Sequence, residues 1–152
     1  MKGPLAAALL AWAGGASGQG VPHPAWVFHS EVIQPEGRAL CLMTAEGEGW
    51  NWLTLEIDGG APRLTLRLHA PPPEGPLTLV FAFPQGEVLG LNGTVAGDTW
   101  SAPVASAEEL FRFATSLGTD QNMRLEVHGP VTDRFPTLMA ADALRRLQAC
   151  AP

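Results

Sequence analysis

The sequence predicts a mainly β protein of the α+β class, built as an antiparallel β-sandwich or a partly open barrel with two helices in its C-terminal half. The first observation behind this prediction is a series of short segments with strand character, separated by turns rich in Gly, Pro and Asn. The second is a pair of late segments with apolar residues at helical spacing. The third is size, because 152 residues, 46% of them hydrophobic, can fill the core of one ordinary domain.

Alternation of apolar and polar residues is clearest in two neighbouring segments, 50–58 and 63–69. Every second residue is apolar from Leu53 to Ile57 and again from Leu64 to Leu68, which predicts strands with one buried face. The sequence Asp58-Gly59-Gly60 between them is typical of a hairpin turn. Strands are expected in all at 26–33, 38–44, 50–58, 63–69, 77–83, 87–91, 99–102 and 122–128.

The connecting segments carry expectations of their own. Gln34-Pro35-Glu36-Gly37 is a turn sequence, and the prolines of 70–76 cannot donate to a strand ladder, so that segment is expected to be a surface loop. Further turns are expected at Asn92-Gly93 and Gly97-Asp98. Segment 77–83 is apolar on both faces, which predicts a central strand covered on two sides.

Two helices are expected after residue 105. Ser106 and Glu109 form a capping-box sequence, which begins a helix that runs to about Leu117 and ends at Gly118. The second helix is expected at about 137–149. Its apolar residues recur at spacings of three and four, and they are Ala140, Ala143, Leu144, Leu147 and Cys150.

The N-terminal residues have the pattern of a secretory signal peptide. Lys2 precedes an apolar segment from Pro4 to Ala13, and small residues follow. No apolar run reaches the ~20 residues that a membrane-spanning helix needs. We therefore expect a periplasmic or secreted protein, divided into a signal peptide at 1–18 with cleavage near Gly18 and Gln19, a Pro-rich lead-in at 19–25, and a single β-rich domain at 26–152.

Cys41 and Cys150 are the two cysteines of the chain. In an exported protein an even number favours a disulfide, and two cysteines permit one pairing. Cys150 also continues the apolar stripe of the second helix, which is the direction that a bridge to a strand cysteine requires. Two buried free thiols or a thiol nucleophile remain as alternatives, although the sequence contains no CxxC motif.

Charge and glycine spacing exclude several classes of partner. The formal net charge of −6 argues against nucleic acid and against an anionic membrane surface. Gly15, Gly18 and Gly20 follow no strand and precede no helix, so they lack the context of a nucleotide-binding loop. No cofactor is expected, and the sequence does not indicate the oligomeric state.

The sequence contains none of the common patterns for catalysis or metal binding. The histidines at 23, 29, 69 and 128 show no HxH, HxxxH or HExxH spacing, so no metal site is expected, although His69 and His128 could bind a metal weakly if their strands were neighbours. GxSxG is absent, and Ser30 is only a sequence neighbour of His29. Glu46, Glu48, Glu56 and Asp58 fit a solvated acidic surface more simply than an acid–base pair.

The order of these features resembles small exported alphaproteobacterial proteins related to the invasion-associated locus B family. The resemblance is carried by Trp26, by a strand with Cys41-Leu42-Met43, by the capped helix, by the strand sequence MRLEVHG, and by the closing segment 135–150 with its terminal Cys150. Met139 departs from it, standing where a small residue is common, and no second cysteine precedes Cys41. The resemblance implies a periplasmic β-rich domain and assigns no catalytic residue.

Trp50 and Trp52 are the candidate binding residues. They share the parity of Thr54 and Glu56, opposite the leucine face, so they are expected on the outer face of the sheet beside the acidic turn at 46–48. The alternative is that a helix covers that face and buries both indoles. Trp26 and Trp100 are expected in the core or as loop anchors.

The function expected from these features is non-enzymatic: binding or supporting an envelope component, such as a protein or a glycan. Two alternatives remain open. One is a small periplasmic hydrolase with a spatially assembled Ser/His/acid site. The other is a metal or redox accessory protein, which would need a reduced Cys41 or Cys150.

Overall fold

The computed structural model describes residues 25–150, in which nine strands form one antiparallel sheet and two helices lie in the C-terminal half of the chain. The predicted signal peptide and residues 19–24 of the lead-in lie outside the described residues. The predicted fold class is confirmed, in the form of an open sheet that does not close into a barrel. The elements are β1 (Val27–Ile33), β2 (Arg38–Glu46), β3 (Trp52–Asp58), β4 (Ala61–Arg67), β5 (Gly75–Ala82), β6 (Val88–Ala96), β7 (Thr99–Ala102), α1 (Ala107–Thr115), β8 (Arg124–His128), β9 (Asp133–Pro136) and α2 (Ala140–Cys150).

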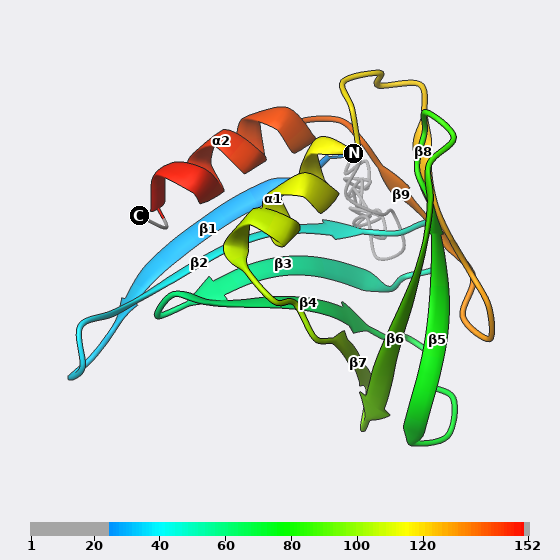
Figure 1. Ribbon diagram of the computed structural model, residues 1–152, viewed down its shortest axis with the longest axis horizontal. Helices are drawn as coiled ribbons and strands as arrows, with labels where there is room; N and C mark the ends of the chain where they lie inside the picture. The colour runs from blue at the N-terminus through cyan, green and yellow to red at the C-terminus, as the bar shows by residue number, and fades with distance from the viewer. Residues whose placement is uncertain (1–24, 151–152) are drawn as a thin grey trace, which may run out of the picture.

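The strands follow the order β1-β2-β3-β4-β7-β6-β5-β8-β9 across the sheet, and each pair of neighbours is antiparallel. The sheet bends strongly, so that β1 to β4 run across the direction of β5, β6 and β8 (Figure 1). Helices α1 and α2 both lie in the concavity of this bend. We call the face toward the helices the inner face and the opposite one the outer face.

The inner face carries the core. Met43, Leu55 and Leu64 lie directly across from one another on β2, β3 and β4, and none of them is more than 2% exposed. This confirms the alternation predicted for 50–58 and 63–69. Rings fill the bend of the sheet, because the ring centroid of Phe81 lies 5.9 Å from that of Trp100 and 5.3 Å from that of Phe113 on α1.

The two ends of the sheet are linked through Trp26, although their edge strands do not pair. The backbone N–H of Trp26 donates to the carbonyl of Leu138 at 2.9 Å, and its indole Nε1–H donates to the carbonyl of Pro136 at 2.8 Å. Trp26 is 3% exposed, as expected for a core anchor. The start of β1 is therefore fixed to the chain between β9 and α2.

Cys41 and Cys150 form the predicted disulfide. The bridge joins β2 to the last residue of α2 and spans 109 residues of sequence. Helix α2 packs against β1 and β2, and its own residues Ala143 and Leu147 are buried. The C-terminal helix is thus held on the inner face by both apolar contact and a covalent bond.

Helix α1 begins at the predicted cap. The side-chain Oγ of Ser106 accepts from the backbone N–H of Glu109 at 3.3 Å. The Glu109 carboxylate accepts from the N–H of Ala105 at 3.1 Å, one residue earlier than a standard capping box places it. Gly118 follows the helix with a φ of +70°, so a residue without Cβ suits the end of the helix.

Several boundaries differ from the sequence predictions. Asn92-Gly93 is not a turn but part of β6, because Gly93 lies beneath the Trp100 indole where a Cβ would overlap the ring. Strand β9 was not predicted at all. Strand β5 is central as predicted, yet its outer face is only half-buried. Helix α2 begins at Ala140 because Met139 has a φ of +64°.

Candidate functional site

The loop between β2 and β3, residues 47–51, closes on itself and is attached to the far end of the sheet. We call it the Trp50 loop. The N–H of Gly47 donates to the carbonyl of Asn51 at 2.8 Å, and the N–H of Trp50 donates to the carbonyl of Gly47 at 3.0 Å. The N–H of Glu48 donates to the carbonyl of Arg134 in β9 at 3.0 Å. Backbone hydrogen bonds therefore fix both the shape of the loop and its position against β9.

The carboxylate of Asp133 anchors this loop. Asp133 is the first residue of β9 and is 4% exposed. Its carboxylate accepts hydrogen bonds from the backbone N–H of Gly49 at 2.7 Å and from Asn51 Nδ2 at 2.6 Å. It also accepts from the backbone N–H of the next residue, Arg134, at 2.7 Å. The N–H of Asn51 adds a longer contact of 3.3 Å. A carboxylate buried to this degree requires such donors, and the loop supplies most of them.

Asn51 extends the anchor to a third segment of the chain. Its side chain is buried with Asp133, and its Oδ1 accepts from the backbone N–H of His69 at 2.9 Å. One amide group therefore joins the Trp50 loop, the start of β9 and the segment that leaves β4. We call the Asn51 and Asp133 side chains with these partners the Asn51–Asp133 anchor.

Two glycines let the loop approach Asp133 closely. A Cβ on Gly47 would overlap the Asp133 carboxylate, and a Cβ on Gly49 would lie 3.1 Å from its carboxyl carbon. Neither position has a positive φ, so the requirement is for space and not for backbone freedom. The sequence Gly47-Glu48-Gly49 is therefore explained by the packing of a buried carboxylate.

Trp50 has a strained backbone. Its φ of 67° lies in the left-handed region, which costs a residue with a side chain on the order of 1–2 kcal/mol. The hydrogen bonds on either side of it, at Gly49 and Asn51, hold it there. Strain of this kind persists where the surrounding structure fixes one conformation, and here it directs an indole to the surface.

The two candidate tryptophans line one cleft. It has a volume of about 570 Å³ and is bounded by Glu46, Trp50, Trp52, Arg67, Leu68, His69, Pro71 and Asp98. We call it the Trp50–Trp52 cleft. Glu46, Trp52 and Arg67 are direct cross-strand neighbours on the outer face of β2, β3 and β4. Arg67 Nε lies 3.5 Å from Asp98 Oδ2, and the carbonyl of Asp98 accepts from the N–H of Leu68 at 2.6 Å.

Both indoles are half-buried, so the alternative in which a helix covers them is wrong. The physical reason is the direction of the bend, because α1 and α2 lie in the concavity and Trp52 is on the outer face. Trp100, by contrast, is on the inner face and completely buried. Trp52 is on the outer face of β3 as expected, whereas Trp50 lies in the loop before β3 and not on the predicted strand, because its φ of 67° breaks the extended backbone. The role of both residues in binding stays a prediction.

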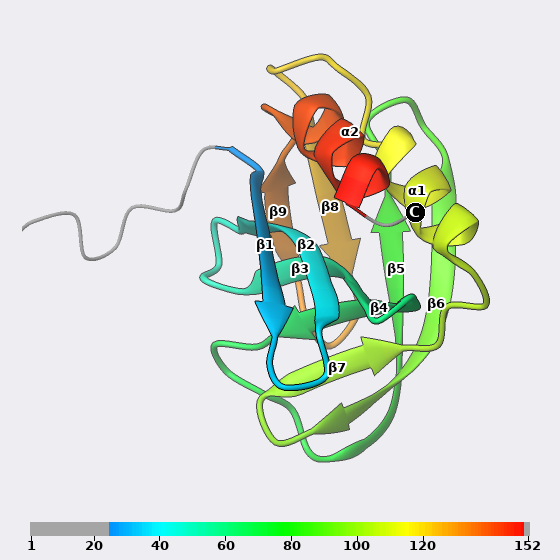
Figure 2. The same cartoon turned by 90° about the vertical axis from the view of Figure 1, so that its left-hand side faces the viewer.

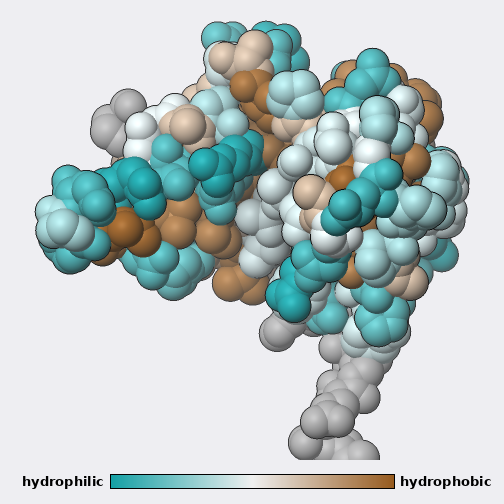
Figure 3. Space-filling model, turned by 90° about the horizontal axis from the view of Figure 1, so that it is seen from below, coloured by the Kyte–Doolittle hydropathy of each residue, from teal (hydrophilic) through white to brown (hydrophobic). Residues whose placement is uncertain are grey.

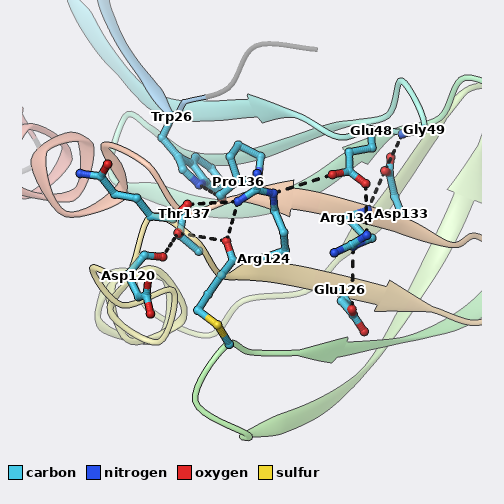
Figure 4. A network of polar contacts seen from close by, with 12 residues as sticks. Trp26, Glu48, Gly49, Asp120, Arg124, Glu126, Asp133, Arg134, Pro136 and Thr137 are labelled. Atoms are coloured by element: carbon cyan, nitrogen blue, oxygen red, sulfur yellow. Dashed lines mark hydrogen bonds and ion pairs between the residues drawn. The ribbon is translucent and has the colours of Figure 1, made fainter. Parts of the chain in front are cut away.

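The acidic turn expected beside the tryptophans divides between two environments. Glu46 lines the cleft, whereas the side chain of Glu48 points toward two arginines (Figure 4). Its carboxylate lies 3.8 Å from Arg124 Nε and 3.7 Å from Arg134 Nη1. Glu48 therefore belongs to the attachment of the loop to β8 and β9, and Glu46 is the acidic residue of the segment 46–48 that lines the cleft.

The described histidines are not assembled into a site. His29, His69 and His128 are exposed, and each of His29 and His128 contacts a glutamate two residues away. Strands β4 and β8 are not neighbours, so His69 and His128 are not brought together. Within residues 25–150 no Ser hydroxyl hydrogen-bonds to a histidine, and no group of three or more His, Cys, Asp or Glu side chains could hold a metal ion. His23 lies outside the described residues.

The remaining acidic candidates form ion pairs on the outer face. Arg38 Nε lies 2.7 Å from Asp58 Oδ1, and Arg63 contacts Glu56 at 3.5 Å. Neither carboxylate lines the cleft. Among the helices in the described part of the chain, none is long and apolar enough to cross a membrane.

Asn51 and Asp133 are not among the residues that the sequence indicates. Asp133 lies in a strand of only four residues, and nothing local distinguishes it from the other acidic residues. A usable indication was the pair of glycines around Glu48, since closely spaced glycines outside an obvious hairpin turn can mark a close approach of the backbone to another group.

The comparisons with known proteins found no relative, because no family model, no curated protein and no solved structure matches the chain. The protein is therefore described by its fold and its cleft alone. It is a disulfide-linked antiparallel β protein with two tryptophans in a cleft on the outer face of its sheet.

Proposed function

We propose that this protein is an exported, non-enzymatic domain that binds an envelope component, and that the ligand occupies the Trp50–Trp52 cleft. The observation that carries the proposal is the strained Trp50. Its indole is held at the surface by a buried polar anchor, beside a second indole in the same cleft. Burying Asp133 and straining Trp50 both cost free energy, and binding explains why the fold retains them.

A saccharide fits the chemistry of this cleft better than a peptide does. The faces of Trp50 and Trp52 are large apolar surfaces on which the C–H face of a sugar ring can pack. Arg67 and His69 supply N–H donors, and Glu46 and Asp98 supply acceptors, so both halves of a hydroxyl group can be satisfied. The residues that line the cleft do not form a deep apolar pocket of the kind that accepts a peptide side chain. We therefore infer a glycan of the envelope as the ligand.

Export is supported by the disulfide and by the predicted signal peptide. Disulfides persist in oxidising compartments such as the periplasm and the extracellular space. The signal peptide predicted at 1–18 and the resemblance to the invasion-associated locus B proteins point to the same compartment. We propose a periplasmic or secreted location on these grounds.

The experiment is a binding screen of the purified protein against immobilised oligosaccharides and polysaccharides of bacterial envelopes. Wild-type protein is expected to bind a defined subset, and the variants Trp50→Ala and Trp52→Ala are expected to lose that binding. Val88→Ala is the matched control, because Val88 is 64% exposed on β6 and is not a cleft residue. Unchanged binding by both tryptophan variants would show that the cleft is not the site.

A further inference from the structure

Strand β1 has an unpaired outer edge. It stands at one end of the sheet, and among residues 25–150 its one strand partner is β2. All seven residues of β1 pair in unbroken register with β2, so the strand contains no bulge. Its sequence, Val-Phe-His-Ser-Glu-Val-Ile, also contains no proline and no lysine. Glu31 is the one acidic side chain in the strand, and β1 lacks the proline, the lysine and the bulge that protect many edge strands from pairing.

The other edge of the sheet is protected in the usual way. Strand β9 has only four residues and ends in Pro136, whose nitrogen carries no hydrogen. Arg134 places a charged side chain in the middle of it. The two edges of one sheet thus differ, and only β1 offers a long ladder of backbone donors and acceptors.

The side chains of β1 are unusually apolar for an exposed strand. Val27 is 48% exposed and Val32 is 60% exposed, and these are two of the five exposed large hydrophobic residues among those described. Figure 2 shows β1 at the margin of the sheet, with α2 set back toward α1 and away from the outer edge. Figure 3 shows hydrophobic side chains along the arm that β1 and β2 form, bordered by polar ones.

The sequence of β1 is complementary to itself in antiparallel orientation. If two copies pair with Ser30 opposite Ser30, His29 of each copy lies opposite Glu31 of the other. In the same register Phe28 lies opposite Val32, and Val27 lies opposite Ile33. Every cross-strand pair is then either apolar with apolar, histidine with glutamate, or serine with serine.

The His29–Glu31 pair also gives this register its specificity. Within one chain His29 Nε2 lies 3.8 Å from Glu31 Oε2, which is longer than a hydrogen bond, and both side chains are exposed, so each can form a shorter contact across two copies. A neutral imidazole can donate its N–H to a carboxylate, so a pair across two copies does not require a protonated histidine. Shifting the register by two residues would place Glu31 opposite Glu31 or His29 opposite His29, which disfavours the alternatives.

We propose that two copies of this protein form a symmetric dimer by antiparallel pairing of their β1 edges, with Ser30 at the two-fold axis. The occupant of the edge is a second copy because the charge and apolar patterns of β1 match themselves, as an interface with two-fold symmetry requires. The pairing extends the sheet across both copies and covers Val27 and Val32. No cleft residue belongs to β1, so the dimer is independent of the proposed ligand site.

The test begins with sedimentation velocity of the full chain over a concentration series from about 1 µM to about 1 mM, the range in which small interfaces associate. Wild-type protein is expected to move from the mass of one chain to twice that mass. Val32→Lys is expected to remain a single chain throughout, because it places an ammonium group against Phe28 of the other copy. Val88→Lys, the same change at a valine that is 64% exposed elsewhere, is expected to dimerise like wild type.

A charge exchange tests the register. His29→Glu places like charges opposite each other at two symmetric positions and is expected to weaken the dimer about tenfold or more. Glu31→Lys removes the acceptor and is expected to weaken it as well. The double variant His29→Glu with Glu31→Lys restores opposite charges and is expected to recover the wild-type dissociation constant. Both positions are on an exposed strand, and circular dichroism verifies that each of the three variants is folded.

Hydrogen exchange locates the interface directly. Protection of segment 27–33 is expected to rise with protein concentration, while protection of segment 133–136 does not change. The proposal is overturned if wild-type protein stays a single chain up to about 1 mM, if Val32→Lys dimerises as well as Val88→Lys does, or if the double variant fails to recover. An unchanged exchange rate in β1 of a protein that does dimerise would overturn it equally.

Discussion

Asn51 and Asp133 are 82 residues apart in the sequence, and Asn51 Nδ2 donates a buried hydrogen bond of 2.6 Å to Asp133 Oδ2. This contact joins the loop after β2 to the first residue of β9, which is the last strand of the sheet order. Because the same carboxylate also accepts from Gly49, it determines where the loop lies and which way Trp50 points. The shape of the cleft therefore depends on a polar contact behind it.

The first prediction concerns this carboxylate. Asp133→Ala leaves the donors of Gly49 and Asn51 buried without an acceptor, so we expect the free energy of unfolding to fall by about 3 kcal/mol. Asp98→Ala is the control, because Asp98 is exposed and its ion pair with Arg67 contributes about 0–1 kcal/mol. Urea denaturation measures both. An equal, small loss for the two variants would contradict the role given to Asp133.

The second prediction concerns the space beside Asp133. Gly47→Ala introduces a Cβ that overlaps the carboxylate, and we expect a loss of about 1–3 kcal/mol with a changed loop conformation. Gly90→Ala is the matched control, since a Cβ at Gly90 meets no atom within 4 Å and the backbone has no positive φ. That variant is expected to be as stable as wild type or more stable. Thermal denaturation distinguishes the two, and equal melting temperatures would refute the packing argument.

The third prediction separates the backbone of Trp50 from its indole. Because φ at Trp50 is 67°, Trp50→Gly is expected to be more stable than Trp50→Ala by about 1 kcal/mol. At Trp52, within β3, the order is expected to reverse, because glycine weakens a regular strand. Chemical denaturation of the four variants gives both differences. Finding alanine preferred at both positions would show that the backbone at Trp50 is not strained.

The parts of the fold that the sequence predicted correctly are those set by local physics. Apolar and polar residues alternate regularly in β3 and β4, where each buried leucine is followed by a polar residue. The Ser106 cap involves only residues that are four or fewer positions apart in the sequence. The disulfide between Cys41 and Cys150 could be predicted from the sequence alone because two cysteines allow a single bridge. The outer position of Trp52 followed from parity with Thr54.

The features that the sequence did not predict depend on contacts between different elements of the fold. Gly93 looks like a turn residue in sequence, and only the Trp100 indole lying against it explains why β6 continues through it. Nothing in the local sequence around Asn51 or Asp133 marks the two residues as partners, because their hydrogen bond joins positions 82 residues apart that meet only in the folded sheet. The free edge of β1 likewise appears only when the strand order is known.

The fourth prediction concerns the disulfide. Cys41→Ala with Cys150→Ala removes a link that spans 109 residues, and we expect the free energy of unfolding to fall by about 2–5 kcal/mol, chiefly because the unfolded chain gains freedom. Guanidinium denaturation measures the loss. Mass analysis of the purified protein after alkylation without reductant is expected to find neither sulfur modified. Modification of both would contradict the bridge and the oxidising compartment inferred from it.

The measurement that tests the central claim most directly is the affinity of Trp50→Gly for the envelope saccharide that wild-type protein binds best, by isothermal titration calorimetry. This variant lacks the indole and relieves the backbone strain, and circular dichroism verifies that it is folded before its affinity is compared. We expect the dissociation constant to rise at least about tenfold in the folded variant. Wild-type affinity in this variant, or a wild-type protein that binds no saccharide at all, would contradict the account.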